Sequence, residues 1–187
     1  YNQAVLDRLE DPNNAASEEV AKVRGDAYTE FLLKAKKRIE ARGKKMRLNF
    51  EVDSLRSDIP AKRLLAYPAN MELQWRRWIA EVSPDEAVIR HYGLTFDQVM
   101  NDARTTEIVS LLNEKEIPVF FNRYMRPHEQ GRFISDIDAI RARQEYAGFV
   151  FYEVAAFVNY NSDGTCTFKY PEIVEAIRHA VQAEVGK

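Results

Sequence analysis

Four short apolar segments recur along the chain, and helical patterns separate them. We predict strands at residues 46–53, 86–91, 117–123 and 148–153. The segments begin 40, 31 and 31 residues apart, and a (β/α)₈ barrel of about 250 residues has roughly 31 residues in each strand–helix unit. Strands that alternate with helices pair in parallel through right-handed crossovers. The spacing therefore predicts an α/β fold of about four parallel strands with flanking helices.

The order of the elements favours half of a (β/α)₈ barrel. One helix precedes the first strand, and four strand–helix units follow, so we expect residues 1–187 to form a single domain that is the C-terminal half of such a barrel. A half barrel has two bare sheet edges. We expect the missing N-terminal half, or a second copy of the chain, to close it. A small open doubly wound sheet is the alternative.

Helical patterns and their end signals define the predicted helices. Residues 18–42 form a long amphipathic pattern that begins at the N-cap candidate Ser17 and ends before Gly43. Thr95 and Gln98 form a capping box at the start of another helix, which we expect to continue to Leu112. The predicted core stripe of the long helix is Val20, Val23, Ala27, Phe31, Ala35 and Ile39, and further stripes are Trp75, Trp78, Ile79 and Val82, and Ile134, Ile137 and Ile140.

Composition excludes several classes of function. Lys and Arg number 27 against 29 Asp and Glu, so a broad nucleic-acid footprint is not expected, although a local basic patch is compatible with this balance. No apolar run is long enough to span a bilayer. Cys166 is the single cysteine and the histidines are far apart, so we expect no disulfide, no metal site and no cofactor. The chain begins at Tyr1 without an initiator Met or a signal peptide, which suggests a piece of a longer protein.

The first predicted strand carries polar residues on one whole face. Met46, Leu48, Phe50 and Val52 alternate with Arg47, Asn49, Glu51 and Asp53. Parallel strands are normally apolar on both faces. Glu51 and Asp53 come last, at the carboxyl end where barrel enzymes place their chemistry. A solvated edge strand, or a structural ion pair of Arg47 with Glu51, is the alternative interpretation.

The other predicted strands also change from apolar to polar at their carboxyl ends. The residues at these ends are Arg90 and His91, Asn122 and Arg123, and Tyr152 and Glu153. A turn at Ser162-Asp163-Gly164 predicts a small hairpin over residues 158–168. Tyr160 in that hairpin is a candidate for stacking on a sugar ring, although hairpin packing also explains it.

Short motifs along residues 1–157 resemble the family-10-like glycoside-hydrolase-like barrels of bacteria. They are Tyr1–Val5, Arg24–Asp26, Thr29–Leu32, Ala41–Lys44, Trp75, Trp78–Ile79, Ile89–Arg90, Pro118–Val119, Asn122–Arg123, Gly148–Phe149 and Tyr152–Glu153. The resemblance implies a (β/α)₈ fold in which this chain supplies strands five to eight. It also implies a role in carbohydrate chemistry, and it favours a secreted or periplasmic location.

The chain departs from the large retaining clan of barrel glycosidases at one important position. Members of that clan resemble one another in placing the acid/base at the end of strand four and a nucleophilic Glu at the end of strand seven. Strand four is absent here, and the strand that corresponds to seven ends at Asn122-Arg123. The candidate carboxylates are therefore Glu51, Asp53 and Glu153. A catalytic pair would lie about 5–5.5 Å apart for retention or roughly 6.5–9.5 Å apart for inversion.

These observations lead to a functional hypothesis with two rivals. We predict a glycoside hydrolase that acts on the O-glycosidic bonds of a polysaccharide or cell-wall glycan and that is inactive as this fragment alone. A non-catalytic barrel that binds glycan is the first rival, and a structural or interaction domain is the second. The predicted catalytic residues are Glu153 and Glu51 with Asp53 in support, and the predicted substrate-binding residues are Arg90, His91, Asn122, Arg123, Tyr152 and Tyr160.

Overall fold

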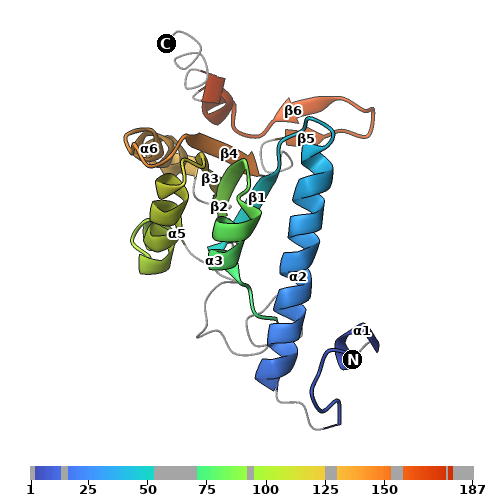
Figure 1. Ribbon diagram of the computed structural model, residues 1–187. Coiled ribbons are helices and arrows are strands. Elements are labelled where there is room, and N and C mark those ends of the chain that lie inside the picture. Colours follow the sequence, from blue (N-terminus) through green and yellow to red (C-terminus); the bar gives the residue numbers. More distant parts are fainter. Residues whose placement is uncertain are drawn as a thin grey trace. The chain divides into compact units, whose positions relative to one another are not determined.

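The structure is a computed structural model that describes residues 3–13, 17–52, 71–91, 95–124, 130–152, 158–175 and 177–178 (Figure 1). Its four main strands form one parallel sheet in the order β1-β2-β3-β4. The strands are β1 (Arg47–Glu51), β2 (Glu86–Arg90), β3 (Val119–Tyr124) and β4 (Gly148–Tyr152). The predicted α/β class is confirmed, and each end of each strand lies within two residues of its predicted position.

The strand order separates the two predicted folds. A doubly wound sheet contains a point at which the order of its strands reverses. The described strands follow chain order without a reversal, which is consistent with half of a (β/α)₈ barrel.

No helix in the described part of the chain combines the length and apolarity that a membrane crossing requires.

The chain divides into two compact units, residues 1–119 and 120–187. The first unit contains, besides β1 and β2, the helices α1 (Gln3–Leu6), α2 (Ser17–Glu40), α3 (Trp75–Arg77), the π-helical η2 (Trp78–Val82), α4 (Phe96–Met100) and α5 (Ala103–Glu114). The second contains β4 and nearly all of β3, with α6 (Gln130–Arg141), β5 (Val158–Tyr160) and β6 (Cys166–Phe168). The prediction of a single domain stays a prediction.

Helix α2 ends before Gly43 as predicted, but its buried face differs in part from the predicted stripe. Gly43 has a φ of 64°, and the N–H of Lys44 donates to the carbonyl of Ile39 at 3.2 Å, which is a left-handed C-terminal cap. Phe31, predicted to lie in the core, is 61% exposed, and Ala27 is exposed as well. The buried face comprises Val20, Ala21, Gly25, Thr29, Leu32 and Lys36.

Polar partners explain why α2 is rotated relative to the prediction. The Thr29 side chain donates to Oε1 of Gln74 and accepts from Nε1 of Trp78, both at 2.9 Å. Lys36 lies 2.6 Å from the carboxylate of Asp85. Burial of polar groups is tolerated when they are paired, so the apolar stripe read from the sequence placed Val20 correctly in the core but wrongly included Ala27 and Phe31.

The first unit has a core between the sheet and its helices. Phe50 of β1 lies 6.3 Å from the ring of Trp78, between centroids, and both side chains are at least 96% buried. Trp75 is 6% exposed, so the prediction that both tryptophans belong to the core is confirmed. The helix that we expected from Thr95 to Leu112 is in fact two helices, because Asp102 is extended and caps Thr105 to start α5.

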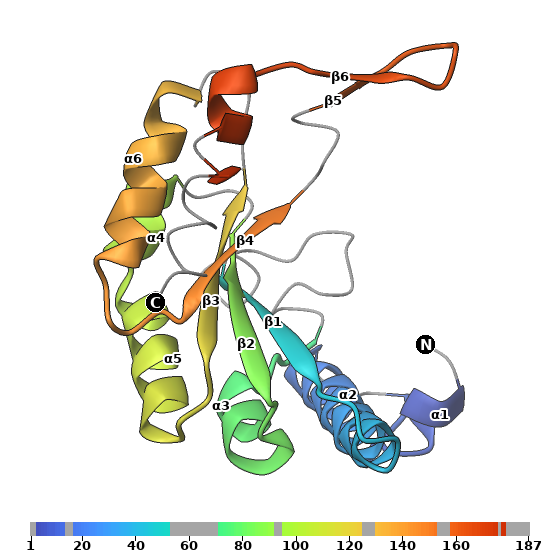
Figure 2. The same cartoon turned by 90° about the horizontal axis from the view of Figure 1, so that it is seen from above.

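The second unit has its own core, formed by Phe133, Ile137, Val158 and Ile173. Ile134, predicted to be buried, is 43% exposed, and Phe133 takes its place with no exposure. The predicted hairpin is confirmed, since β5 and β6 pair antiparallel. Figure 2 shows this hairpin extending away from α6.

Candidate functional site

The polar face of β1 is the first part of the candidate site. Arg47 and Asn49 are exposed and Glu51 is partly exposed, whereas Leu48 and Phe50 between them are buried. Arg47 donates from Nε to Oε2 of Glu86 at 2.7 Å. The ion pair at the amino end of this face therefore joins two strands, and Arg47 pairs with Glu86, whereas the alternative interpretation paired it with Glu51.

Glu51 and Arg90 lie next to each other at the carboxyl ends of β1 and β2. Their Cα atoms are register partners, and neighbouring strands are about 4.8 Å apart. Residues in register on parallel strands point to the same face. Arg90 is partly exposed, and its guanidinium can donate to hydroxyl or carboxylate oxygens through a planar set of N–H groups.

His91 does not belong to this accessible surface. It follows β2 in the alternation that places Ala87 and Ile89 on the buried side of the sheet. Its side chain is 2% exposed. His91 is therefore inaccessible in the described structure, and its predicted role in substrate binding stays a prediction.

In the second unit the predicted residues lie on the paired strands β3 and β4. Asn122 is the register partner of Val150 and Arg123 that of Phe151, and Tyr124 is paired with Tyr152. Asn122 is 4% exposed, and its Oδ1 atom accepts no hydrogen bond among the described residues. Buried amide oxygens are usually hydrogen-bonded, and Asn122 is nearly as inaccessible as His91, so its predicted role in substrate binding stays a prediction.

The remaining predicted residues are placed as follows. Tyr160 lies on β5 opposite Cys166 and is 67% exposed, so it is accessible to a ligand. Asp53 and Glu153 lie outside the described residues. Within the described part of the chain, Glu51 is therefore the only one of the three predicted catalytic carboxylates.

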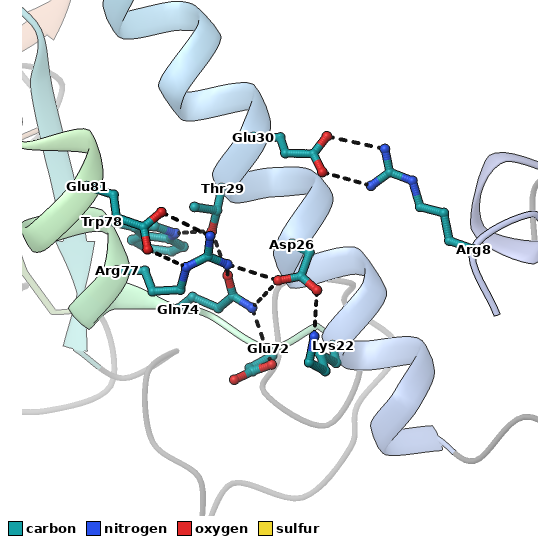
Figure 3. Close-up of polar contacts among 10 residues, drawn as sticks. All are labelled: Arg8, Lys22, Asp26, Thr29, Glu30, Glu72, Gln74, Arg77, Trp78 and Glu81. Atoms are coloured by element: carbon teal, nitrogen blue, oxygen red, sulfur yellow. Dashed lines mark hydrogen bonds and ion pairs between the residues drawn. The ribbon is translucent and has the colours of Figure 1, made fainter. Parts of the chain in front are cut away.

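A polar cluster between α2 and the segment of residues 72–81, which includes α3 and most of η2, was not predicted from the sequence (Figure 3). Asp26 accepts from Nζ of Lys22 at 2.8 Å, from Nε2 of Gln74 at 2.9 Å and from Nη1 of Arg77 at 2.9 Å. Hydrogen bonds from Lys22 and then Gln74 lower the pKa of the Asp26 carboxyl group. Arg77 also pairs with Glu81.

This cluster is better suited to structure than to catalysis. Each of its cations faces a carboxylate, and Arg8 nearby pairs with Glu30 at 3.2 Å. Within the described residues both cations of the cluster are paired, and the Glu72 carboxylate accepts from Nε2 of Gln74 at 3.4 Å, so its charges are held in structural contacts. The spacing of Asp26 and Thr29 on one helix was the available signal, but their partners Gln74 and Trp78 come more than 40 residues later in the sequence.

Within the described residues, no three His, Cys, Asp or Glu side chains come together as metal ligands would. Comparisons with protein-family models, with curated proteins and with solved structures found no match. The resemblance to glycoside-hydrolase-like barrels therefore stays a prediction.

Proposed function

We propose that the protein is a glycoside hydrolase that acts on a polysaccharide or cell-wall glycan, with Glu51 as a catalytic carboxylate. The observation that carries this proposal is the register pairing of Glu51 with Arg90 at the carboxyl ends of β1 and β2. Asp53 and Glu153 are the other proposed carboxylates. Glu153 is proposed because it directly follows β4, which ends at Tyr152.

The polarity of β1 supports this proposal. A strand in a parallel sheet is usually apolar on both faces, and polar groups are costly in a barrel interior unless they are paired or functional. β1 buries Leu48 and Phe50 on one face and carries Arg47, Asn49 and Glu51 on the other. Pairing with Glu86 accounts for Arg47, whereas Glu51 lies at the end of the sheet where barrel enzymes act.

Glu51 and Arg90 suit different parts of glycoside hydrolysis. A carboxyl group protonates the leaving oxygen or attacks the sugar carbon, and a second carboxylate completes the pair. Arg90 would hold substrate hydroxyl oxygens with its N–H groups.

Closure of the barrel is part of the proposal. Four strands are half the number in a (β/α)₈ barrel. We therefore propose that a preceding half barrel or a second copy of the chain supplies the other strands, and that the present chain alone does not cleave glycan.

The experiment compares two Glu→Gln substitutions at opposite ends of one sheet face in the intact gene product. Release of reducing ends from a panel of neutral and acidic polysaccharides is measured. Glu51→Gln should lower cleavage by at least about 100-fold, since loss of an acid or base costs 10²–10⁴-fold. Glu86→Gln is the matched control, because Glu86 shares the face but lies at the amino end, and cleavage should persist.

Binding without cleavage would indicate a different function. If the wild-type protein retains a glycan on an affinity gel but releases no reducing ends, the protein is a non-catalytic glycan-binding barrel. The exposed rings of Tyr160 and Phe168, 67% and 57% accessible, would suit that function. If Glu51→Gln cleaves as fast as wild type, Glu51 has no catalytic role.

A further inference from the structure

The C-terminal half of α2 and the link after it form a strongly basic surface. Residues 31–47 contain eight Lys and Arg but one carboxylate, Glu40, whereas the whole chain has 27 basic and 29 acidic residues. Six of these cations are exposed. We call them the basic patch: Lys34, Lys37, Arg38, Arg42, Lys44 and Lys45.

The basic patch is not neutralised by the described part of the protein. No described carboxylate lies within ion-pair distance of any of its six cations. The two other cations of the segment differ in this respect. Lys36 pairs with Glu40 at 3.3 Å and with Asp85 at 2.6 Å, and Arg47 pairs with Glu86.

Helix stability does not explain this arrangement. Cations near a helix C-terminus interact favourably with its dipole, but the effect is limited to the last turn, which holds Lys37 and Arg38. Lys34 lies four residues before Arg38, and like charges at that spacing destabilise a helix. Lys44 and Lys45 lie beyond the end of α2. The repulsion between Lys34 and Arg38 lowers the stability of the helix, which indicates that an anion outside the chain compensates for this repulsion.

An exposed aromatic side chain lies among these cations. Phe31 is 61% exposed and stacks on Tyr28 with ring centroids 6.2 Å apart. Phe31, Lys34, Ala35, Lys37 and Arg38 line one shallow groove on α2. Helices that rest on bilayers combine Lys and Arg with an inserted Phe, Trp or Leu side chain.

We propose that the basic patch and Phe31 dock the protein on the surface of an anionic lipid bilayer. Clusters of four to eight Lys and Arg on an amphipathic helix are typical of binding to anionic lipids. A bilayer offers negative headgroups to the cations and an apolar layer to Phe31. The patch extends along α2 from Lys34 to Arg38 and over the link after it, which fits a broad surface better than a single polymer strand. This docking is peripheral and does not depend on the proposed function.

The test is co-sedimentation of the full chain with vesicles. One set contains phosphatidylcholine alone, and in the other about a third of the lipid is phosphatidylglycerol. Wild type should bind the second set and not the first, with binding that weakens as salt is raised. The double variant Lys34→Gln/Arg38→Gln should bind about 30-fold more weakly, because each cation near the surface contributes roughly fivefold.

A matched control changes the same charge elsewhere. Arg143→Gln/Arg178→Gln removes two cations that form surface ion pairs in the second unit, and its vesicle binding should equal that of wild type. Phe31→Ser should weaken binding about tenfold and leave the salt dependence unchanged. Circular dichroism checks that each variant is folded.

Three results would overturn the proposal. They are equal binding to both sets of vesicles, equal loss in the control and the patch variant, and absence of vesicle binding while DNA or an acidic polysaccharide is retained. The last result would assign the basic patch to a polyanionic polymer instead.

Discussion

Replacement of Gly25 by alanine tests the packing of α2 against the segment that precedes α3. A Cβ atom at residue 25 would collide with the carbonyl oxygen of Glu72 and lie 3.1 Å from the carbonyl carbon and Cβ of that residue. The backbone there has little freedom to move, because the N–H of Glu72 donates to the carbonyl of Ala21 at 2.9 Å.

The expected loss follows from three contributions. Alanine is better than glycine inside a helix by about 1 kcal/mol. Overpacking of a tight contact costs about 1–3 kcal/mol, and loss of the hydrogen bond from Glu72 to Ala21 costs about 1 kcal/mol. The free energy of unfolding of Gly25→Ala should therefore fall by about 1–3 kcal/mol, although helix propensity alone predicts a rise.

Urea denaturation followed by circular dichroism measures this difference. Ala27→Gly, at an exposed position two residues later, reports helix propensity without packing and should lose about 1 kcal/mol. If Gly25→Ala is more stable than wild type, the carbonyl group of Glu72 does not lie against Gly25 as the structure has it.

Three more predictions concern single side chains. Thr29→Val leaves buried hydrogen-bonding groups without their partner and should lower the free energy of unfolding by about 1–3 kcal/mol, whereas the exposed Thr106→Val should have little effect in the same urea assay. Hydrogen bonds from Lys36 and a backbone N–H lower the pKa of the Asp85 carboxyl group from 3.8. The stability that ionised Asp85 contributes is therefore present above about pH 4 and lost as the pH falls through the lowered pKa. When the pH is lowered over this range, the free energy of unfolding should fall less in Asp85→Asn than in wild type. Glu116 has a φ of 56°, so Glu116→Gly should raise the melting temperature, since left-handed backbone costs other residues about 1–2 kcal/mol.

The sequence predicted the strands well because their signal is local. Runs such as Phe149–Tyr152 are apolar, and a glycine or proline precedes several of them. The capping box of Thr95 and Gln98 is formed as predicted, since both of its residues lie within one turn of the helix.

Predictions failed where a distant partner decides the outcome. Thr29 and Lys36 are buried because Gln74 and Asp85 pair with them across 45 and 49 positions of the chain, and no local pattern reveals this. Ile134 and Phe133 are neighbours on α6, and the choice between them depends on packing against Phe151 of β4, whose ring lies 5.3 Å from that of Phe133.

The candidate site was predicted only in part. Alternation along β1 correctly separated Glu51 from the buried residues, because successive side chains of a strand point to opposite faces and the other face of β1 is apolar. His91 was included because it follows a strand, but the same alternation places it on the buried side. The polar cluster at Asp26 was missed because it joins two helices that are remote in sequence.

Release of reducing ends by Glu51→Gln, relative to Glu86→Gln, tests the central claim most directly. Loss of at least about 100-fold in the first variant, with cleavage retained in the second, is the predicted result. Equal rates in the two variants would contradict a catalytic site at the carboxyl ends of β1 and β2.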